Sequence, residues 1–102
     1  MPSIDASKVR KLIVACDAGM GSSVMLASTL KKQLKKTDVT VEHTPVHYLP
    51  ADAELVLCHH GLADRAREVA PGAVVVSFQL FLGDPAVAKV VDMLKNGGTI
   101  DG

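Results

Sequence analysis

Residues 11–23 read KLIVACDAGMGSS, an apolar run that ends in a cysteine and is followed by a short loop with two glycines. The apolar segment Lys11–Cys16 predicts a strand buried on both faces, as in the middle of a parallel sheet. The glycines of Asp17–Gly21 break that run, and Ser22–Lys36 then carries apolar residues at helical spacing. A strand, a loop and a helix in this order indicate a β-α unit and favour a fold of alternating strands and helices.

Strand and helix patterns alternate through the rest of the chain. Further strands are expected at Val39–His43, Leu55–Cys58 and Ala73–Val76, and further helices at Leu62–Val69 and from Asp84-Pro85 to Gly97. Repeated β-α units imply a mostly parallel sheet, because each crossover returns the chain to the same end. We therefore expect an α/β, Rossmann-like fold with a four-stranded parallel sheet in the order 2-1-3-4 and helices on both faces.

The length and composition suit one domain. The chain has 102 residues, of which 48% are hydrophobic, so it contains enough apolar residues to form one aliphatic core. The ends, Met1–Lys8 and Gly97–Gly102, show no regular pattern and are expected to be loose. We therefore expect a single domain over residues 1–102, with its core at about 10–96, and a monomer.

The charge balance excludes several classes of protein. Eleven basic and eleven acidic residues cancel, which argues against a nucleic-acid binder with a basic excess. The chain lacks a stretch near the roughly 20 apolar residues that span a bilayer, and residues 1–11 lack the apolar run of a signal peptide. A cytoplasmic chain without direct membrane insertion is expected.

The loop after the first strand has the features of a phosphate loop. In parallel sheets ligands bind at the carboxyl ends of strands, which is where Cys16 stands. Gly19 and Gly21 allow close backbone approach, and successive N–H groups form an anion-binding nest. The helix that begins near Ser22 adds N–H donors and a partial positive charge. The expected phosphate-binding residues are Asp17, Ala18, Gly19, Met20, Gly21, Ser22 and Ser23.

Cys16 is the expected nucleophile of this loop. The same N–H donors stabilise a thiolate there and favour attack on a phosphoryl donor, which gives a phosphocysteine. A cysteine phosphatase places an arginine six positions after its cysteine, and this chain has Ser22 there. Without that guanidinium the transition-state charge is less well neutralised, so we expect phosphoryl transfer rather than hydrolysis.

The end of the third expected strand brings Cys58, His59 and His60 toward the same loop. For His59 a phosphate contact stands beside the alternative of a solvated loop residue, whereas Cys58 is expected in the core and His60 in solvent. No metal site is expected, because adjacent histidines do not easily converge on one ion.

Three further features of the loops have two interpretations each. Asp17 either has a functional role, in which it tunes the lability of the phosphoryl group or contacts a partner, or it caps the loop. Met20 and Phe78–Leu82 (FQLFL) are apolar where loops are usually polar. They either pack over the end of the sheet or form a docking patch around the cysteine. We expect Met20 to be at least partly exposed.

The segment Ile13–Lys36 (IVACDAGMGSSVMLASTLKKQLKK) closely resembles the IIB component, mannitol type, of the bacterial phosphoenolpyruvate-dependent sugar phosphotransferase system. The likeness continues through Glu54–Ala66 (ELVLCHHGLADRA) and covers most of Lys11–Leu94. It implies a four-stranded parallel sheet with three helices. His59 matches a histidine found after the family's third strand, whereas His60 and Gly61 replace an arginine and an aspartate of a familiar member.

The resemblance also implies partners and a reaction. Cys16 would accept a phosphoryl group from a histidine of the IIA component and pass it to mannitol in the membrane-embedded IIC component, giving mannitol 1-phosphate. No cofactor is implied beyond the covalent phosphoryl group, and the chain would associate with the inner face of the cell membrane through IIC. The alternatives are a phosphorylation-sensing IIB-like regulatory domain, a cysteine phosphatase and a redox protein that uses Cys16 and Cys58.

Overall fold

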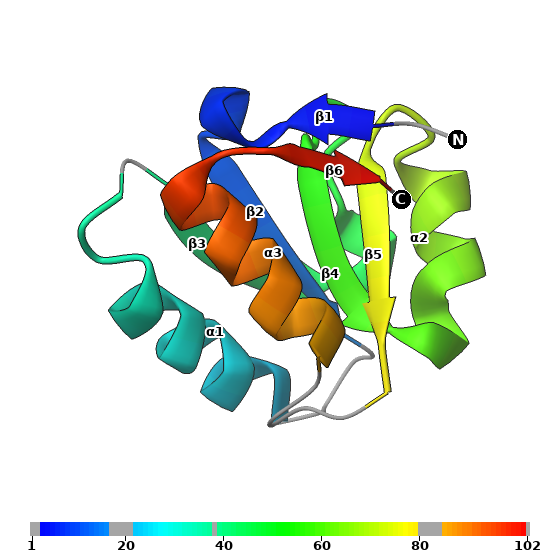
Figure 1. The fold of residues 1–102 in the computed structure, drawn as a ribbon. Helices are drawn as coiled ribbons and strands as arrows, with labels where there is room; N and C mark the ends of the chain where they lie inside the picture. Colours follow the sequence, from blue (N-terminus) through cyan, green and yellow to red (C-terminus); the bar gives the residue numbers. More distant parts are fainter. Residues whose placement is uncertain (1–2, 17–21, 38, 80–84, 102) are drawn as a thin grey trace.

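The computed structural model describes residues 3–16, 22–37, 39–79 and 85–101 (Figure 1). Its central element is a parallel sheet of four strands: β2 (Lys11–Cys16), β3 (Thr40–Pro45), β4 (Leu55–His59) and β5 (Val74–Phe78). The strands lie in the order β3-β2-β4-β5, so β2 and β4 are central. The expectation of an α/β fold with a four-stranded parallel sheet is confirmed.

The central strand β2 is buried on both faces, as its continuous apolar run predicted. Leu12 and Val14 belong to the core cluster on one face, and Ile13 and Ala15 to the cluster on the other. The edge strand β3 differs, since Val41 is its one buried residue and the residues on either side of it are exposed. Burial on two faces selects a run of apolar residues, whereas burial on one face selects alternation.

Helices cover both faces of the sheet (Figure 1). Helices α1 (Ser22–Gln33) and α3 (Pro85–Asn96) pack on one face, where they bury an aliphatic cluster. Helix α2 (Ala63–Val69) and the 3₁₀ turn Val46–Tyr48 pack on the other face. The second face is lined largely by alanines, whose small side chains let a helix of seven residues lie close to the strands.

The ends of the described chain form a second, two-stranded sheet, in which β1 (Ser3–Asp5) pairs antiparallel with β6 (Thr99–Asp101). The expectation of loose ends is therefore wrong for these residues. Ile4 stands opposite Ile100, which is buried against the main core. Strands of three residues are too short to show alternation, and each is stable only because the distant partner is present.

Local boundaries differ from the sequence prediction in a few places. Helix α1 ends at Gln33 instead of Lys36, and Val24 is 45% exposed, although its spacing fits the apolar stripe, while Leu26 is buried. Strand β3 runs to Pro45, beyond the expected end at His43, and a 3₁₀ turn that buries Val46 follows it. Strand pairing and burial on the second face, which are both long-range, decide these boundaries.

The connections around helices α2 and α3 also have defined structure. The 3₁₀ turn His60–Leu62 precedes α2, and Ala6–Lys8 forms another after β1. Helix α3 begins at Pro85, as predicted, because the ring of proline suits the first helical position. Gly97 and Gly98 end that helix with φ values of 90° and 137°, a conformation that favours glycine.

Candidate functional site

The four parallel strands end at one edge of the sheet, and the expected site lies at that edge. The last residues of β2, β3, β4 and β5 are Cys16, Pro45, His59 and Phe78. Ala15 is the register partner of Cys58, so Cys16 and His59 are the next positions along two adjacent strands. Because adjacent strands are about 4.8 Å apart, the structure brings the backbones of these two residues together.

Most of the expected phosphate loop lies outside the described residues. This holds for Asp17, Ala18, Gly19, Met20 and Gly21, and for the side chains of Cys16, Ser22 and Ser23. The structure describes the two anchors of the loop, namely the backbone end of β2 at Cys16 and the start of α1 at Ser22. The structure therefore describes the strand and the helix that flank the expected loop, and the arrangement of N–H groups within the loop stays a prediction.

The imidazole of His59 is held by contacts from two elements. Its Nδ1 accepts a hydrogen bond from the backbone N–H of Gly61 at 3.3 Å, which caps the 3₁₀ turn His60–Leu62. Its ring stands edge-on to Phe78, with 6.2 Å between ring centroids and 90° between planes. Since Nδ1 accepts, a neutral His59 carries its proton on Nε2 and presents a donor there.

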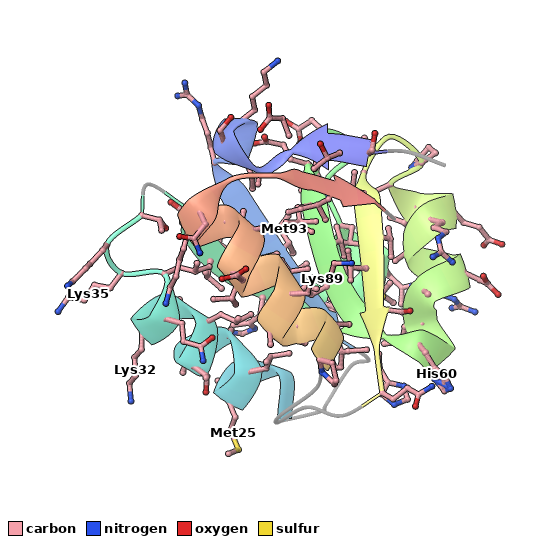
Figure 2. All side chains as sticks on the ribbon, in the orientation of Figure 1. Met25, Lys32, Lys35, His60, Lys89 and Met93 are labelled. Atoms are coloured by element: carbon pink, nitrogen blue, oxygen red, sulfur yellow. The ribbon has the colours of Figure 1, made fainter. Side chains whose placement is uncertain are left out.

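Two neighbours complete this edge of the sheet. His60 is exposed, as expected, and its ring lies 4.8 Å from that of His59 at an interplanar angle of 77°. It points outward below α2 in Figure 2. A shallow hollow of about 300 Å³ separates the end of β5 from the start of α3 and is lined by His60, Ser77, Phe78, Gln79, Pro85 and Ala86.

The second cysteine, Cys58, is a core residue, as expected. It is 0% exposed and belongs to the cluster beneath α2. Burial raises the pKa of its thiol to about 11, and the positive charge of Arg67 opposes that rise without cancelling it. A thiol with such a pKa is protonated at neutral pH, so Cys58 is unsuited to nucleophilic attack.

Residues 11–93 match the family described as "PTS system, Lactose/Cellobiose specific IIB subunit". The chain belongs to this IIB family. The matched range runs from the start of β2 into α3, so it includes the whole parallel sheet, Cys16 and His59. The small sheet of β1 and β6 lies outside it.

Curated relatives give the same family. The chain is 43% identical over 91 residues to the mannitol-specific EIICB component of Geobacillus stearothermophilus, covering 87% of this chain and 19% of that protein. It is 42% identical to the corresponding component of Bacillus subtilis, and the match covers 90% of this chain and 20% of that protein. It is 43% identical to the mannitol-specific EIICBA component of Vibrio cholerae, and the match covers 89% of this chain and 14% of that protein. The chain thus spans about a fifth or less of these relatives' length.

The structure of this IIB chain adds residues that the sequence interpretation missed. The N–H of Gly61 and the ring of Phe78 orient His59. The contact with Gly61 has a sequence signal, namely a glycine two positions after a polar residue that ends a strand. Phe78 is 2% exposed, so packing, rather than docking, explains it. The remainder of FQLFL from residue 80 onward lies outside the described residues.

Two findings bear on ions and membranes. Among the described residues, His, Cys, Asp and Glu side chains form no group of three or more that could hold a metal ion. In the same residues, no helix combines the length and the apolar character needed to cross a membrane.

Proposed function

We propose that this chain is a phosphoryl carrier of a sugar phosphotransferase system, with Cys16 as the residue that is phosphorylated. The observation that carries the proposal is the position of Cys16 in the matched IIB range. It is the last residue of the central strand β2, directly before the loop that leads into α1. A 12-residue helix that starts after such a loop supplies N–H donors and a positive dipole end for a phosphoryl group.

The reaction has two displacement steps. In the first, the Cys16 thiolate attacks phosphorus on a phosphohistidine of IIA, so that an S–P bond forms while the N–P bond breaks and its electron pair returns to the imidazole. In the second, a sugar hydroxyl attacks, an O–P bond forms, the S–P bond breaks and the thiolate is regenerated. The hydroxyl proton passes to a base of IIC or to water. The loop N–H groups of residues 17–23 stabilise the phosphoryl oxygens in both steps.

His59 is the proposed second contact to the phosphoryl group. Its neighbouring strand position supports this role, as does the hydrogen bond that leaves the proton of the neutral ring on Nε2. A donor at Nε2 stabilises the negative oxygens of phosphocysteine without supplying a proton for hydrolysis.

The sugar and the partners follow from the names of relatives. The relatives at 43% and 42% identity are mannitol-specific components, so we propose D-mannitol as the acceptor and mannitol 1-phosphate as the product. The letters EIICB in those names support a membrane-embedded IIC partner, with IIA as donor. The chain then acts as a single monomeric domain at the cytoplasmic face of the membrane, with no metal or cofactor besides the phosphoryl group.

Intact mass spectrometry tests the proposal. The chain is incubated with phosphoenolpyruvate, the general phosphotransferase proteins and the matched IIA. The native chain and Cys58→Ala are expected to gain one phosphoryl group, and Cys16→Ser none. If the native chain gains nothing while IIA is phosphorylated, the carrier function is wrong. Adding IIC membranes with mannitol or cellobiose then identifies the sugar as the one that removes the group.

A further inference from the structure

Four exposed lysines from two helices gather at one end of the molecule. Lys32 lies in the last turn of α1, Lys35 and Lys36 follow it, and Lys95 lies in the last turn of α3. With Gln33 and Thr37 they line one hollow of about 510 Å³. We call these four residues the lysine patch. In Figure 2 Lys32 and Lys35 extend from the end of α1 that is opposite Met25.

The face of the sheet that α1 and α3 cover carries an excess of positive charge. The whole sequence has eleven basic and eleven acidic residues. Yet helices α1 and α3, together with residues 34–37 that follow α1, contain six lysines and a single carboxylate, Asp92. Helix α2 on the other face has two acidic and two basic residues. No ion pair joins the lysine patch to a carboxylate of the described residues.

We propose that the lysine patch is a weak electrostatic docking surface for an anionic lipid bilayer. The residue types favour this occupant. Protein interfaces are rich in arginine and aromatic residues and poor in lysine, and single-stranded nucleic acids need aromatic rings to stack on. The patch has neither arginine nor an aromatic ring. Flexible ammonium groups instead suit a fluid layer of anionic headgroups, which demands charge but no fixed geometry.

The position of the patch sets the orientation on the bilayer. Helix α1 has 12 residues, so its two ends are about 18 Å apart. The lysine patch is at one end, and the carboxyl edge of the sheet, with Cys16, is at the other. A chain seated on the patch therefore turns the carboxyl edge away from the bilayer. If the proposed function holds, this is the orientation in which a water-borne IIA reaches Cys16. The lipid contact itself does not depend on that function.

The expected binding is weak and sensitive to salt. Each lysine near an anionic surface strengthens binding about fivefold. Attraction of this kind falls off within a Debye length of about 10 Å at 0.1 M salt. Such an interaction holds the chain only when another tether, such as the proposed IIC partner, keeps it close to the membrane.

Vesicle flotation tests the proposal. The full chain is mixed with vesicles of phosphatidylcholine alone or with phosphatidylglycerol added, at low and at high salt. Binding is expected only to the anionic vesicles, and only at low salt. Replacing Lys32, Lys35, Lys36 and Lys95 by glutamine is expected to weaken binding at least tenfold. The control replaces Arg65, Arg67 and Lys89 by glutamine, which removes three positive charges that lie outside the lysine patch and is expected to change binding less than threefold.

Two results would overturn the proposal without touching phosphorylation of Cys16, which is measured separately. One is absence of binding to anionic vesicles, and the other is an equal loss of binding in both variants, which would mean that net charge alone acts. Tighter binding of duplex DNA than of anionic vesicles at the same salt would also reject a lipid surface in favour of a nucleic acid.

Fluorescent labels on one helix test the orientation. A polarity-sensitive dye is attached to Gln33→Cys or to Met25→Cys, each in a Cys16→Ser background, since Cys58 is buried. Both positions are exposed and lie on α1. On anionic vesicles the emission at residue 33 is expected to shift to the blue and that at residue 25 to stay constant. A shift at residue 25 alone would show that the opposite end faces the bilayer.

Discussion

Strands β2 and β4 lie side by side and each carries a cysteine near the same end of the sheet, yet the two cysteines occupy different positions along their strands. Cys58 stands opposite Ala15, one residue before the end of β4. It is fully buried, and burial raises the pKa of its thiol to about 11. Cys16 is the last residue of β2, and the residues of the expected phosphate loop follow it in the sequence.

One residue of register therefore separates a core thiol from the proposed phosphoryl carrier. Parallel sheets bind ligands beyond the carboxyl ends of their strands, and only the terminal position reaches that space. In β4 the terminal position belongs to His59, whose ring is oriented by Gly61 and Phe78. The residue type alone does not distinguish the two cysteines. Their positions relative to the strand ends do.

The largest expected difference between the two cysteines is in alkylation by iodoacetamide at pH 8. With a pKa of about 11, Cys58 has only about one thousandth of its thiol ionised, against about one tenth for a cysteine with the ordinary pKa of about 9. Cys16 is expected to react at least about 100-fold faster than Cys58, measured by peptide mass spectrometry over time. In concentrated guanidinium chloride the two rates should become equal. Comparable rates in the native chain would contradict the contrast.

The buried thiol also predicts how stability changes with pH. Because the pKa of Cys58 is about 11 in the folded chain and about 9 when unfolded, only the unfolded state gains by ionisation between these values. The contribution is fully present below pH 9 and is lost as the pH rises toward 11. From pH 8 to 10.5 the free energy of unfolding of the native chain should fall about 2 kcal/mol more than that of Cys58→Ala. Urea titrations at both pH values measure this, and parallel losses would refute it.

The smallest expected effect concerns the residue that ends β4. Asparagine at position 59 keeps an acceptor near the place of Nδ1 for the Gly61 N–H but removes the donor at Nε2. Glutamine places an amide N–H near Nε2 and loses that acceptor. His59→Asn is expected to slow phosphoryl transfer to Cys16 about tenfold, which corresponds to one hydrogen bond to a charged group. His59→Gln should retain most of the rate.

Rapid-quench phosphorylation by IIA measures these rates, and urea unfolding gives the matching stability. His59→Gln should be the less stable of the two variants, by about 1 kcal/mol, because it leaves the 3₁₀ turn uncapped. If the slower variant is also the less stable one, His59 supports the fold and does not contact the phosphoryl group.

Elements that are defined by a long local pattern were predictable from sequence. The run Lys11–Cys16 indicated a strand buried on both faces, and Pro85 marked the start of α3. Shorter elements were not predictable. Strands β1 and β6 exist through a pairing of residues almost the whole chain apart, and Val24 lies outside the core although its spacing fits the stripe. Local spacing reports periodicity, whereas long-range contacts decide pairing and the rotation of a helix.

The sequence by itself determined the class of fold, the family and the cysteine on which the proposed function depends, because these follow from residues that are close together along the chain. The tertiary structure decided which groups meet across it. It placed His59 at the strand position next to Cys16, buried Cys58 beneath α2, and brought Lys95 to the lysines that end α1. Each of these depends on register or helix packing, which join residues distant in sequence and leave no local pattern.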